Sequence, residues 1–469
     1  MSLLLVSTYE LGRQPVHLAS PTAALVAGGV DVIPLDLAVA DWDTELVDRV
    51  EGVAFSVPMH TAMRLAVSLA GMVREQRPEL PIAFYGLYAA VGSEGTLGRL
   101  ADAVFVGEYE PDLVAWAREL GEPHTGRPEI NSHVGPSRFR TPDRSMLPAH
   151  ENYARLEWEG EARIGGAVEA SHGCRHRCRH CPIPVVYDGR MRVVGSDVVL
   201  SDIDQLVSQG VEHVTFGDPD FLNAPRYSLD IMREAHSAHP DLTFDVTVKV
   251  EHILAHQDLW PVMASLGLLF VVSAFESTDE TTLDILDKNH TVADMKTAVS
   301  ILRSAGVHVR PTWLPFLPWT TPGHLLDLVE FLDANSLWGA TDPVQLSIKL
   351  LIPEGSLLED HPAVVPHLTG YQAETLTWGW SFAHAATEWL QVELDAIAAE
   401  GSDCGADAAE ILATMRDRIA LAGDAELPQM PSSPPTPRLT ESWFCCAEPT
   451  AAQAAAVGLT IGRLPLAIK

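Results

Sequence analysis

The sequence has few cysteines, few basic residues and no long apolar run. Six cysteines in 469 residues are too few for a disulfide framework, so a small secreted fold is excluded. The 31 basic residues are outnumbered by 63 acidic ones, and a net charge of −32 repels a phosphate backbone, which argues against a nucleic-acid partner. The first residues, MSLLLVSTYE, lack the basic start of a signal peptide and the length of a membrane span. We therefore expect a cytoplasmic protein with no membrane partner.

Hydrophobic residues make up 47% of the chain, which is enough for more than one core. In residues 1–120, short β-branched runs alternate with amphipathic segments, and strands are expected at residues 3–7, 31–34, 52–56, 81–85 and 103–106. This alternation predicts a doubly wound, flavodoxin- or Rossmann-like parallel sheet with helices on both faces. Ligands of such sheets bind beyond the carboxyl ends of the strands, here the loops at residues 8–15, 57–61, 86–95 and 107–111.

The rest of the chain predicts a second α/β domain and a helical region. Residues 121–161 are polar and rich in proline, and we interpret them as a linker. Within residues 162–353, strands are expected at 163–169, 211–216, 243–250, 268–275, 308–316 and 344–351, which predicts a partial (β/α)6 barrel. Residues 354–426 are expected to be helical, mainly at 371–400 and 406–422, and residues 427–469 to form a proline-rich connector and a tail.

Three of the six cysteines, Cys174, Cys178 and Cys181, follow the first expected barrel strand. Thiolates at this spacing can bind three irons of a 4Fe-4S cluster and leave the fourth iron without a protein ligand. The amino and carboxylate groups of S-adenosylmethionine (SAM) can chelate that iron, so that one electron cleaves a carbon–sulfur bond. The alternative is a structural zinc or a ferredoxin-type site completed by a histidine. Candidates for that ligand are His172, His176 and His180.

Residues 167–184, AVEASHGCRHRCRHCPIP, together with the six βα units resemble the radical SAM superfamily over roughly residues 163–353. In that family an aromatic residue near the adenine usually precedes the third cysteine, and His180 takes this place. The resemblance also implies contacts with the methionine amino group and the ribose. The corresponding residues are Gly217, Asp218 and Pro219 in VTFGDPDFLN, and Ser273 and Glu276 in VVSAFES. At the end of the third strand, Lys249 is expected to pair with the methionine carboxylate and Glu251 to hydrogen-bond the ribose.

The order of segments resembles that of the cobalamin-binding subclass of this superfamily: a doubly wound domain comes first, then a linker containing PDRSMLP, and then the cysteine loop. Its D-x-H-x-x-G signature, whose histidine ligates cobalt, would fall where this sequence reads TYELGRQPVH. Gly12 matches the turn, but no histidine stands in the ligand position, and His17 is displaced from it. Some members of the subclass bind cobalamin without a histidine ligand. Two interpretations therefore stay open: a cobalamin-binding domain, or a structural or partner-docking module.

The C-terminal WFCCAEP resembles the CCAEP or selenocysteine-containing CUAEP tail of a group of radical SAM proteins. Adjacent cysteines do not readily form a disulfide with each other, so Cys445 and Cys446 are expected to act as soft ligands or separate thiols. Cys446 takes the selenocysteine position, which indicates nucleophilic, redox or soft-metal chemistry. A thiol pair can capture trivalent arsenic, so the tail is a candidate for delivering arsenic, selenium or a thiol-bound substrate to a carbon radical. Two cysteines on a disordered tail are the alternative.

These features predict a radical SAM transferase that forms a carbon–heteroatom bond, such as carbon–arsenic or carbon–selenium, or a carbon–carbon bond on a small substrate. Its electrons would come from a donor such as flavodoxin or ferredoxin. A cobalamin-dependent radical SAM methyltransferase is the alternative within the enzyme class. A non-catalytic iron–sulfur or thiol sensor is the alternative outside it.

Overall fold

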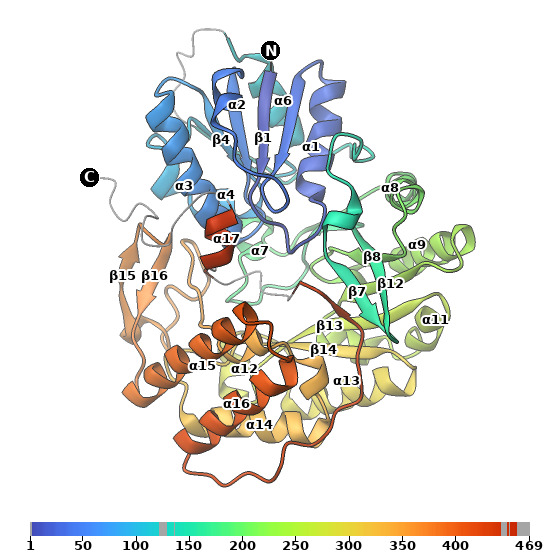
Figure 1. The fold of residues 1–469 in the computed structure, drawn as a ribbon, viewed down its shortest axis with the longest axis vertical. Coiled ribbons are helices and arrows are strands. Elements are labelled where there is room, and N and C mark those ends of the chain that lie inside the picture. Colours follow the sequence, from blue (N-terminus) through green and yellow to red (C-terminus); the bar gives the residue numbers. More distant parts are fainter. Residues whose placement is uncertain (1, 122–128, 136, 442–447, 450, 457–469) are drawn as a thin grey trace.

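The computed structural model describes residues 2–121, 129–135, 137–441, 448–449 and 451–456. Cys445 and Cys446 lie outside these described residues. Two parallel sheets, one in the N-terminal domain and one in the middle of the chain, organise the molecule (Figure 1). None of the helices in the described part of the chain combines the length and the apolar character that a bilayer-spanning helix needs.

The N-terminal sheet has the strand order β2-β1-β3-β4-β5-β6, and all its strands are parallel. Alternate residues of β1 face opposite sides of the sheet. Leu3 and Leu5 pack toward α1 and α6, whereas Leu4 and Val6 pack toward α2 and α3. The doubly wound prediction is therefore confirmed. The elements are β1 (Ser2–Ser7), α1 (Val16–Ala27), β2 (Asp31–Asp36), α2 (Thr44–Asp48), β3 (Gly52–Ser56), α3 (His60–Gln76), β4 (Ile82–Tyr85), α4 (Leu87–Val91), α5 (Ser93–Thr96), β5 (Ala103–Gly107), α6 (Glu110–Arg118) and β6 (Glu129–His133).

Strand β6 lies within residues 121–161, which were expected to be a linker. It pairs in parallel with β5 from Ala103 and Glu129 to Gly107 and His133. Its sequence, EINSH, has no strand-like run of apolar residues, so its conformation depends on the free edge of β5. Gly107 has a positive φ of 77°, and a Cβ there would lie 2.3 Å from the carbonyl oxygen of His133, so this close pairing requires glycine.

The second sheet has the order β14-β13-β12-β11-β8-β7-β17. The five strands from β14 to β8 are parallel and form a curved half-barrel, which confirms the partial-barrel prediction, whereas β7 and β17 continue the sheet as antiparallel strands. The expected sixth strand at 344–351 is reduced to the 3-10 turn η4 (Pro343–Leu346) and a single parallel bridge between Phe316 and Lys349. The strands are β7 (Arg155–Trp158), β8 (Glu161–Val168), β11 (His213–Phe216), β12 (Thr243–Thr247), β13 (Leu268–Glu276), β14 (His308–Trp313) and β17 (Arg438–Leu439).

Helices cover the outer face of the half-barrel and enclose the largest core of the molecule. The main ones are α8 (Ser196–Ser208), α9 (Pro225–Ala238), α13 (Val292–Ser304) and α14 (Pro322–Asn335). Shorter elements on the strand-end loops are β9 (Ser171–Gly173), α7 (Ile183–Tyr187), β10 (Met191–Val193), η2 (Phe221–Asn223), α10 (Val250–Ala255), α11 (Trp260–Ser265) and α12 (Glu280–Ile285).

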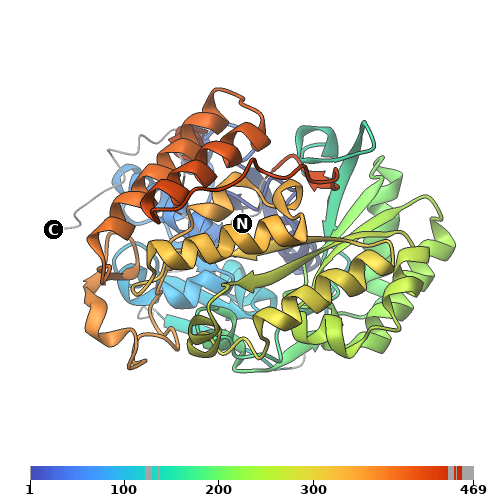
Figure 2. The same ribbon diagram turned by 90° about the horizontal axis from the view of Figure 1, so that it is seen from below.

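The region after the barrel is less helical than expected. Helices α15 (Ala385–Asp403) and α16 (Ala408–Ala422) lie side by side next to α14 (Figure 2). The helix expected at 371–400 begins only at Ala385, because β15 (Leu368–Gln372) and β16 (Thr377–Trp380) form an antiparallel hairpin. Leu376, in the connecting turn, has a positive φ of 58°, which a right-handed helix cannot contain.

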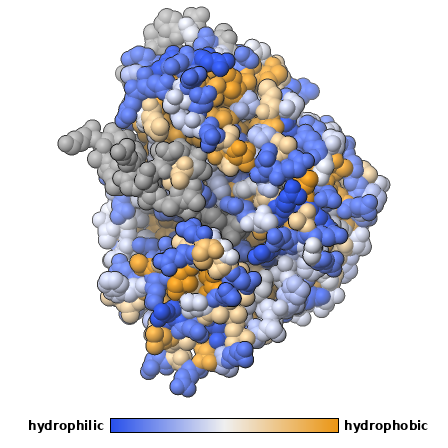
Figure 3. Space-filling model, viewed as in Figure 1, coloured by the Kyte–Doolittle hydropathy of each residue, from blue (hydrophilic) through white to orange (hydrophobic). Residues whose placement is uncertain are grey.

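The described part of the tail returns to the N-terminal domain. Strand β17 extends the barrel sheet by pairing with β7. Beyond it, Glu441 accepts a hydrogen bond of 2.7 Å from the Tyr9 hydroxyl, and Ala454, in α17 (Ala451–Ala456), is buried in the N-terminal core. The face shown in Figure 3 is mostly hydrophilic, with hydrophobic residues in small separate patches, as expected of an acidic water-facing surface.

Arg144, in the segment between the two sheets, ties them together. Its buried guanidinium binds both carboxylate oxygens of Asp202 on α8, at 2.6 and 2.7 Å. It also donates to Gln14 Oε1 in the N-terminal domain, at 2.9 Å, and to the carbonyl of Ala167 on β8, at 2.7 Å. A buried ion pair of this kind fixes geometry, because either charge alone would be left in a medium that solvates it poorly.

Replacing Arg144 by Met should lower the free energy of unfolding by about 3–5 kcal/mol, since the buried Asp202 carboxylate loses its partner. Urea denaturation followed by tryptophan fluorescence measures this change. The control is Arg163→Met, which breaks an ion pair with the exposed Glu161 and should change stability by less than about 0.5 kcal/mol. An equal loss of unfolding free energy in Arg144→Met and Arg163→Met would contradict the stabilising role of the buried ion pair between Arg144 and Asp202.

Candidate functional site

A cavity of about 410 Å³ lies where the carboxyl ends of both sheets meet. All four loops expected to bind a ligand in the N-terminal domain reach it. They contribute, among others, Glu10, Leu11, Met59, Leu87, Tyr88, Gly107 and Tyr109, and His17 lines the cavity from the first turn of α1. The opposite wall comes from the strand ends of the half-barrel and the cysteine loop. A ligand on the N-terminal sheet would thus face groups on the barrel directly.

Cys174, Cys178 and Cys181 all line this cavity. The loop begins after β9, and it turns tightly where the Cys181 amide donates to the Cys178 carbonyl, at 3.1 Å. Burial raises the pKa of the Cys174 thiol, and Asn223 Nδ2 donates to its sulfur, at 3.5 Å. The side chain of Asn223 thus offers a hydrogen bond that would stabilise a thiolate at this position.

A buried carboxylate and a buried ammonium stand beside the cysteines. Glu276 Oε1 lies 3.2 Å from Lys288 Nζ and 3.1 Å from His180 Nε2. Burial opposes ionisation of Glu276, but Lys288 and His180 outweigh it and lower its pKa. Burial likewise opposes protonation of Lys288, but Glu276 and two of the cysteine sulfurs raise its pKa. Glu276 ends β13 at a bulge with a positive φ of 66°, an uncommon conformation that turns the chain at the cavity wall.

Of the other residues expected to contact SAM, four line the cavity and two do not. Gly217, Asp218 and Pro219 line the cavity, and the Asp218 carboxylate accepts hydrogen bonds from the Ala170 amide and the Ser171 hydroxyl. Burial raises the pKa of Asp218 to about 7.

Lys249 also lines the cavity, and its buried Nζ has no hydrogen-bond partner, although it lies 3.6 Å from Glu251. The structure does not bring Ser273 or Glu251 to the cavity wall. Ser273 is fully buried on β13 between Val272 and Ala274, which do line it, and neighbouring strand residues face opposite sides.

Acidic and imidazole side chains alternate across the two domains along one side of the cavity. His17 Nδ1 lies 3.1 Å from Glu10, and its Nε2 lies 3.6 Å from Glu169 at the end of β8. On the far side of Glu169, His172 Nε2 lies 3.2 Å from that carboxylate, and His172 Nδ1 lies 2.8 Å from the buried Glu108. These contacts form a continuous chain that starts in the N-terminal domain, reaches the barrel and returns to the N-terminal domain. Its members, in order, are Glu10, His17, Glu169, His172 and Glu108.

This acid–imidazole chain holds its protons on the histidines. Burial works against the charge on His17, but Glu169 and Glu10 outweigh it and raise its pKa to about 9. Burial also opposes ionisation of Glu169, but His17 and His172 outweigh it and lower its pKa to about 2. Both groups are thus charged at neutral pH. Sequence reasoning missed Glu10, Glu108 and Glu169 and set His17 aside, because the pairs that join the two domains, His17 with Glu169 and His172 with Glu108, form between segments far apart in the chain.

Comparison with known proteins gives one family match. Residues 168–332 match the radical SAM superfamily. The hopanoid C-2 methylase of Rhodopseudomonas palustris (strain TIE-1) is 21% identical over 177 residues, which are 37% of this chain and 34% of the methylase. The match therefore spans only about a third of that curated relative.

Two similar solved structures extend over both domains. The radical SAM methyltransferase TsrM from Kitasatospora setae, with tryptophan substrate and a SAM analogue bound, has a TM-score of 0.59 and 17% identity, covering 76% of this chain and 74% of its own. The cobalamin-dependent SAM radical enzyme OxsB, with aqua-cobalamin bound, has a TM-score of 0.68 and 12% identity, and the match covers 90% of this chain and 72% of OxsB. At these identities the likeness establishes a shared fold.

The charge pair of His17 and Glu169 should make stability depend on pH. The folded pKa of His17, about 9, exceeds its ordinary value of 6.5, so its contribution is complete below pH 6.5 and lost as the pH rises through 9. The contribution of Glu169, whose pKa is lowered to about 2 from 4.5, is complete above pH 4.5. His17→Gln should therefore lower the Tm most between about pH 5 and 6.5 and very little above about pH 9.5.

Differential scanning fluorimetry across this pH range measures the effect. The matched control is His239→Gln, which removes a surface pair with Asp204 and should change the Tm little at any pH. A loss of Tm in His17→Gln that is the same at all pH values would mean that the imidazole contributes by packing alone.

Proposed function

We propose that this chain, which carries a radical SAM domain over residues 168–332, is a cobalamin-dependent radical enzyme that methylates a small molecule. Radical SAM proteins use a 4Fe-4S cluster and SAM. The observation that carries the proposal is the shared cavity: the loops of the N-terminal sheet and the three cysteines line the same space. The resemblance in fold to TsrM and OxsB supports a corrinoid in the N-terminal domain.

The residues of the cysteine loop fit an anionic cluster. Three thiols line one cavity, the Asn223 amide donates to one of them, and the Lys288 ammonium is held beside the other two. Cys404 is exposed on the far helical region and bonds to the Gly401 carbonyl, so it is not a candidate for a fourth ligand. Because the ligands must be thiolates, binding iron would release the proton that burial keeps on Cys174.

The cavity also fits SAM. The buried ammonium of Lys249, which forms no hydrogen bond in the described residues, suits the methionine carboxylate, and the 217–219 backbone suits the amino group. His180 and Glu276 remain candidates for the adenine and ribose side. Glu251 and Ser273 would need to act from outside the described cavity wall.

The N-terminal wall fits a corrinoid bound without an imidazole ligand. Leu11, Met59, Leu87 and Tyr88 offer an apolar surface for a flat macrocycle. Glu10 and Glu169 lie 3.1 and 3.6 Å from the two ring nitrogens of His17 and raise its pKa to about 9, so the imidazole is protonated at neutral pH, which argues against its ligating cobalt. When bound, the corrinoid would supply a methyl group carried on cobalt.

The chain's own residues then have defined tasks. Lys288 and Asn223 stabilise negative charge on the sulfur ligands, and Glu276 fixes Lys288 in place. The acid–imidazole chain holds the two domains at a fixed separation and keeps protonated imidazole at the cavity wall. The apolar residues of both walls exclude water from a reactive radical.

The test is anaerobic reconstitution of the cluster, addition of hydroxocobalamin, and mass spectrometry of the nucleosides formed from SAM after reduction. We expect about one corrinoid per chain and two nucleosides: S-adenosylhomocysteine, because the corrinoid would accept the methyl group of one SAM molecule, and 5′-deoxyadenosine, because reductive cleavage of another would generate the radical. Cys178→Ala should keep the corrinoid but lose 5′-deoxyadenosine formation, and Cys404→Ala should retain both. No corrinoid uptake by the wild-type chain would contradict the proposal.

The tail supports a second candidate, carbon–heteroatom bond formation that uses Cys445 and Cys446. Described residues on both sides of the pair contact the N-terminal domain near the cavity. Glu441 accepts a hydrogen bond from Tyr9, and Glu448 pairs with His60 and Arg64, both at 2.8 Å. Tyr9 and His60 immediately precede and follow the lining residues Glu10 and Met59.

A double variant, Cys445→Ser with Cys446→Ser, tests the second candidate. If the thiols capture a soft element, the wild-type chain should bind trivalent arsenic and the double variant should bind at least about tenfold less, since hydroxyl oxygens are poor ligands for soft ions. Cys404→Ser is the control and should bind as the wild type does. If methylthioadenosine forms and depends on the pair, transfer of an aminocarboxypropyl group replaces methyl transfer as the leading reaction. Unchanged products and arsenic binding in the double variant would exclude the pair from catalysis.

A further inference from the structure

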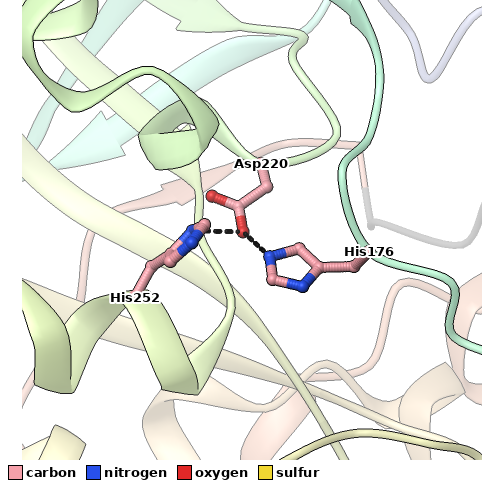
Figure 4. A group of neighbouring side chains, drawn as sticks. All are labelled: His176, Asp220 and His252. Carbon is pink, nitrogen blue, oxygen red and sulfur yellow. Dashed lines mark ion pairs between the residues drawn. The ribbon is translucent and has the colours of Figure 1, made fainter. Parts of the chain in front are cut away.

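Three side chains of types that can bind a metal ion, His176, Asp220 and His252, lie close together beside the cysteine loop (Figure 4). His176 lies on that loop, Asp220 precedes the turn η2 after β11, and His252 is in the first turn of α10 after β12. Their ligand atoms all lie within 4.8 Å of one another. Asp220 Oδ2 is 3.5 Å from His176 Nε2 and 2.9 Å from His252 Nδ1.

The two imidazole nitrogens that face Asp220 are buried and lack hydrogen bonds. The Asp220 carboxylate is fully buried, and both nitrogens face its Oδ2, which also accepts a hydrogen bond of 3.4 Å from the Lys249 amide. Neither His176 Nε2 nor His252 Nδ1 forms a hydrogen bond of acceptable geometry, although both atoms are buried. Buried nitrogens left in this state are costly, so a cation shared with the carboxylate would satisfy both of them at once.

The spacing suits a small divalent ion. Zinc binds histidine nitrogen and carboxylate oxygen at about 2.0–2.2 Å, which places neighbouring ligands of a tetrahedral site about 3.4 Å apart. The two measured separations, 2.9 and 3.5 Å, bracket this value. Two imidazoles and one carboxylate also exclude magnesium and calcium as preferred ions, because both favour all-oxygen sites.

Two outer groups lie against the ligands. The second oxygen of Asp220 accepts a hydrogen bond of 3.0 Å from the Leu222 amide, which orients the carboxylate. The other nitrogen of His176, Nδ1, lies 3.8 Å from Glu251 Oε2, which is too far for a hydrogen bond, so Glu251 acts on this ring through its charge.

We propose that His176, Asp220 and His252 bind one divalent transition-metal ion, zinc by its ligand preference, separate from the irons of the cluster. The ligands come from three strand-end loops, and His176 lies midway between Cys174 and Cys178. The ion therefore clamps the cluster loop to the loops after β11 and β12.

The experiment is zinc titration of the cluster-loaded chain, with metal content measured by mass spectrometry and the zinc environment by X-ray absorption. We expect one zinc per chain in addition to the cluster iron, with nitrogen and oxygen neighbours at about 2.0–2.2 Å. A sulfur neighbour at about 2.3 Å would overturn the proposal, because it would place the ion on cysteines instead. The absence of bound zinc at equimolar metal would also overturn it and leave an acid–base triad without an ion.

Two variants assign the ligands. His252→Ala should weaken zinc binding at least about 100-fold, because loss of even an outer-shell partner costs about 10- to 100-fold. The matched control is His256→Ala, one helical turn further on, whose ring lies 5.8 Å from that of His252 but outside the triad. It should bind zinc as the wild type does.

His252→Cys distinguishes loss of a ligand from a folding defect in His252→Ala. Because cysteine also ligates zinc, this variant should retain zinc and add one sulfur neighbour to the X-ray absorption spectrum. Equal zinc affinity in His252→Ala and the wild type would refute the assignment. So would a loss in His256→Ala as large as that in His252→Ala.

Discussion

All strands of a parallel sheet end at one edge, and this chain places two such edges against each other. The rest of the molecule depends on that constraint. Loops after β1, β3, β4 and β5 meet loops after β8, β11, β12 and β13, so residues from two separate folding units share one cavity. The Arg144 ion pair holds the two sheets in this relation, because it binds Gln14 on one side and Asp202 with Ala167 on the other.

The charges inside the cavity differ from those outside. The chain as a whole carries an excess of acid, yet the buried carboxylates Glu169, Glu276, Asp36 and Asp202 are matched by an imidazole, an ammonium, a hydroxyl and a guanidinium, respectively. Matching is necessary because an unpaired ion in the interior is strongly unfavourable. The polar side chains of the cavity wall therefore hold one another in place. Such preorganised hydrogen-bond donors do not need to reorganise during a reaction.

Local signals in the sequence were sufficient for the strands that have a buried, β-branched core, such as 3–7 and 268–275, and for the cysteines, which are close together in the chain. They were insufficient where structure depends on a distant partner. EINSH is a strand only because β5 has a free edge, and residues 368–380 form a hairpin against the expectation of a helix. Glu108 and His172 are 64 residues apart, so their pairing has no signal in a local pattern. Ser273 matched a motif but faces away from the cavity, since strand alternation depends on register.

The contact between Tyr9 and Glu441 joins residues 432 positions apart. A ribosome therefore makes every other strand of the two sheets before it makes β17 and the residues that follow it. Until then, the edge of β7 is an unpaired strand, and the N-terminal core lacks the cover that Ala454 provides. Contacts of such long range form late and slowly, because a large loop must close first. Strand β17 and Glu441 are thus added to a nascent chain that already contains the loops lining the cavity, and their pairing with β7 and Tyr9 can form only after those loops have been made.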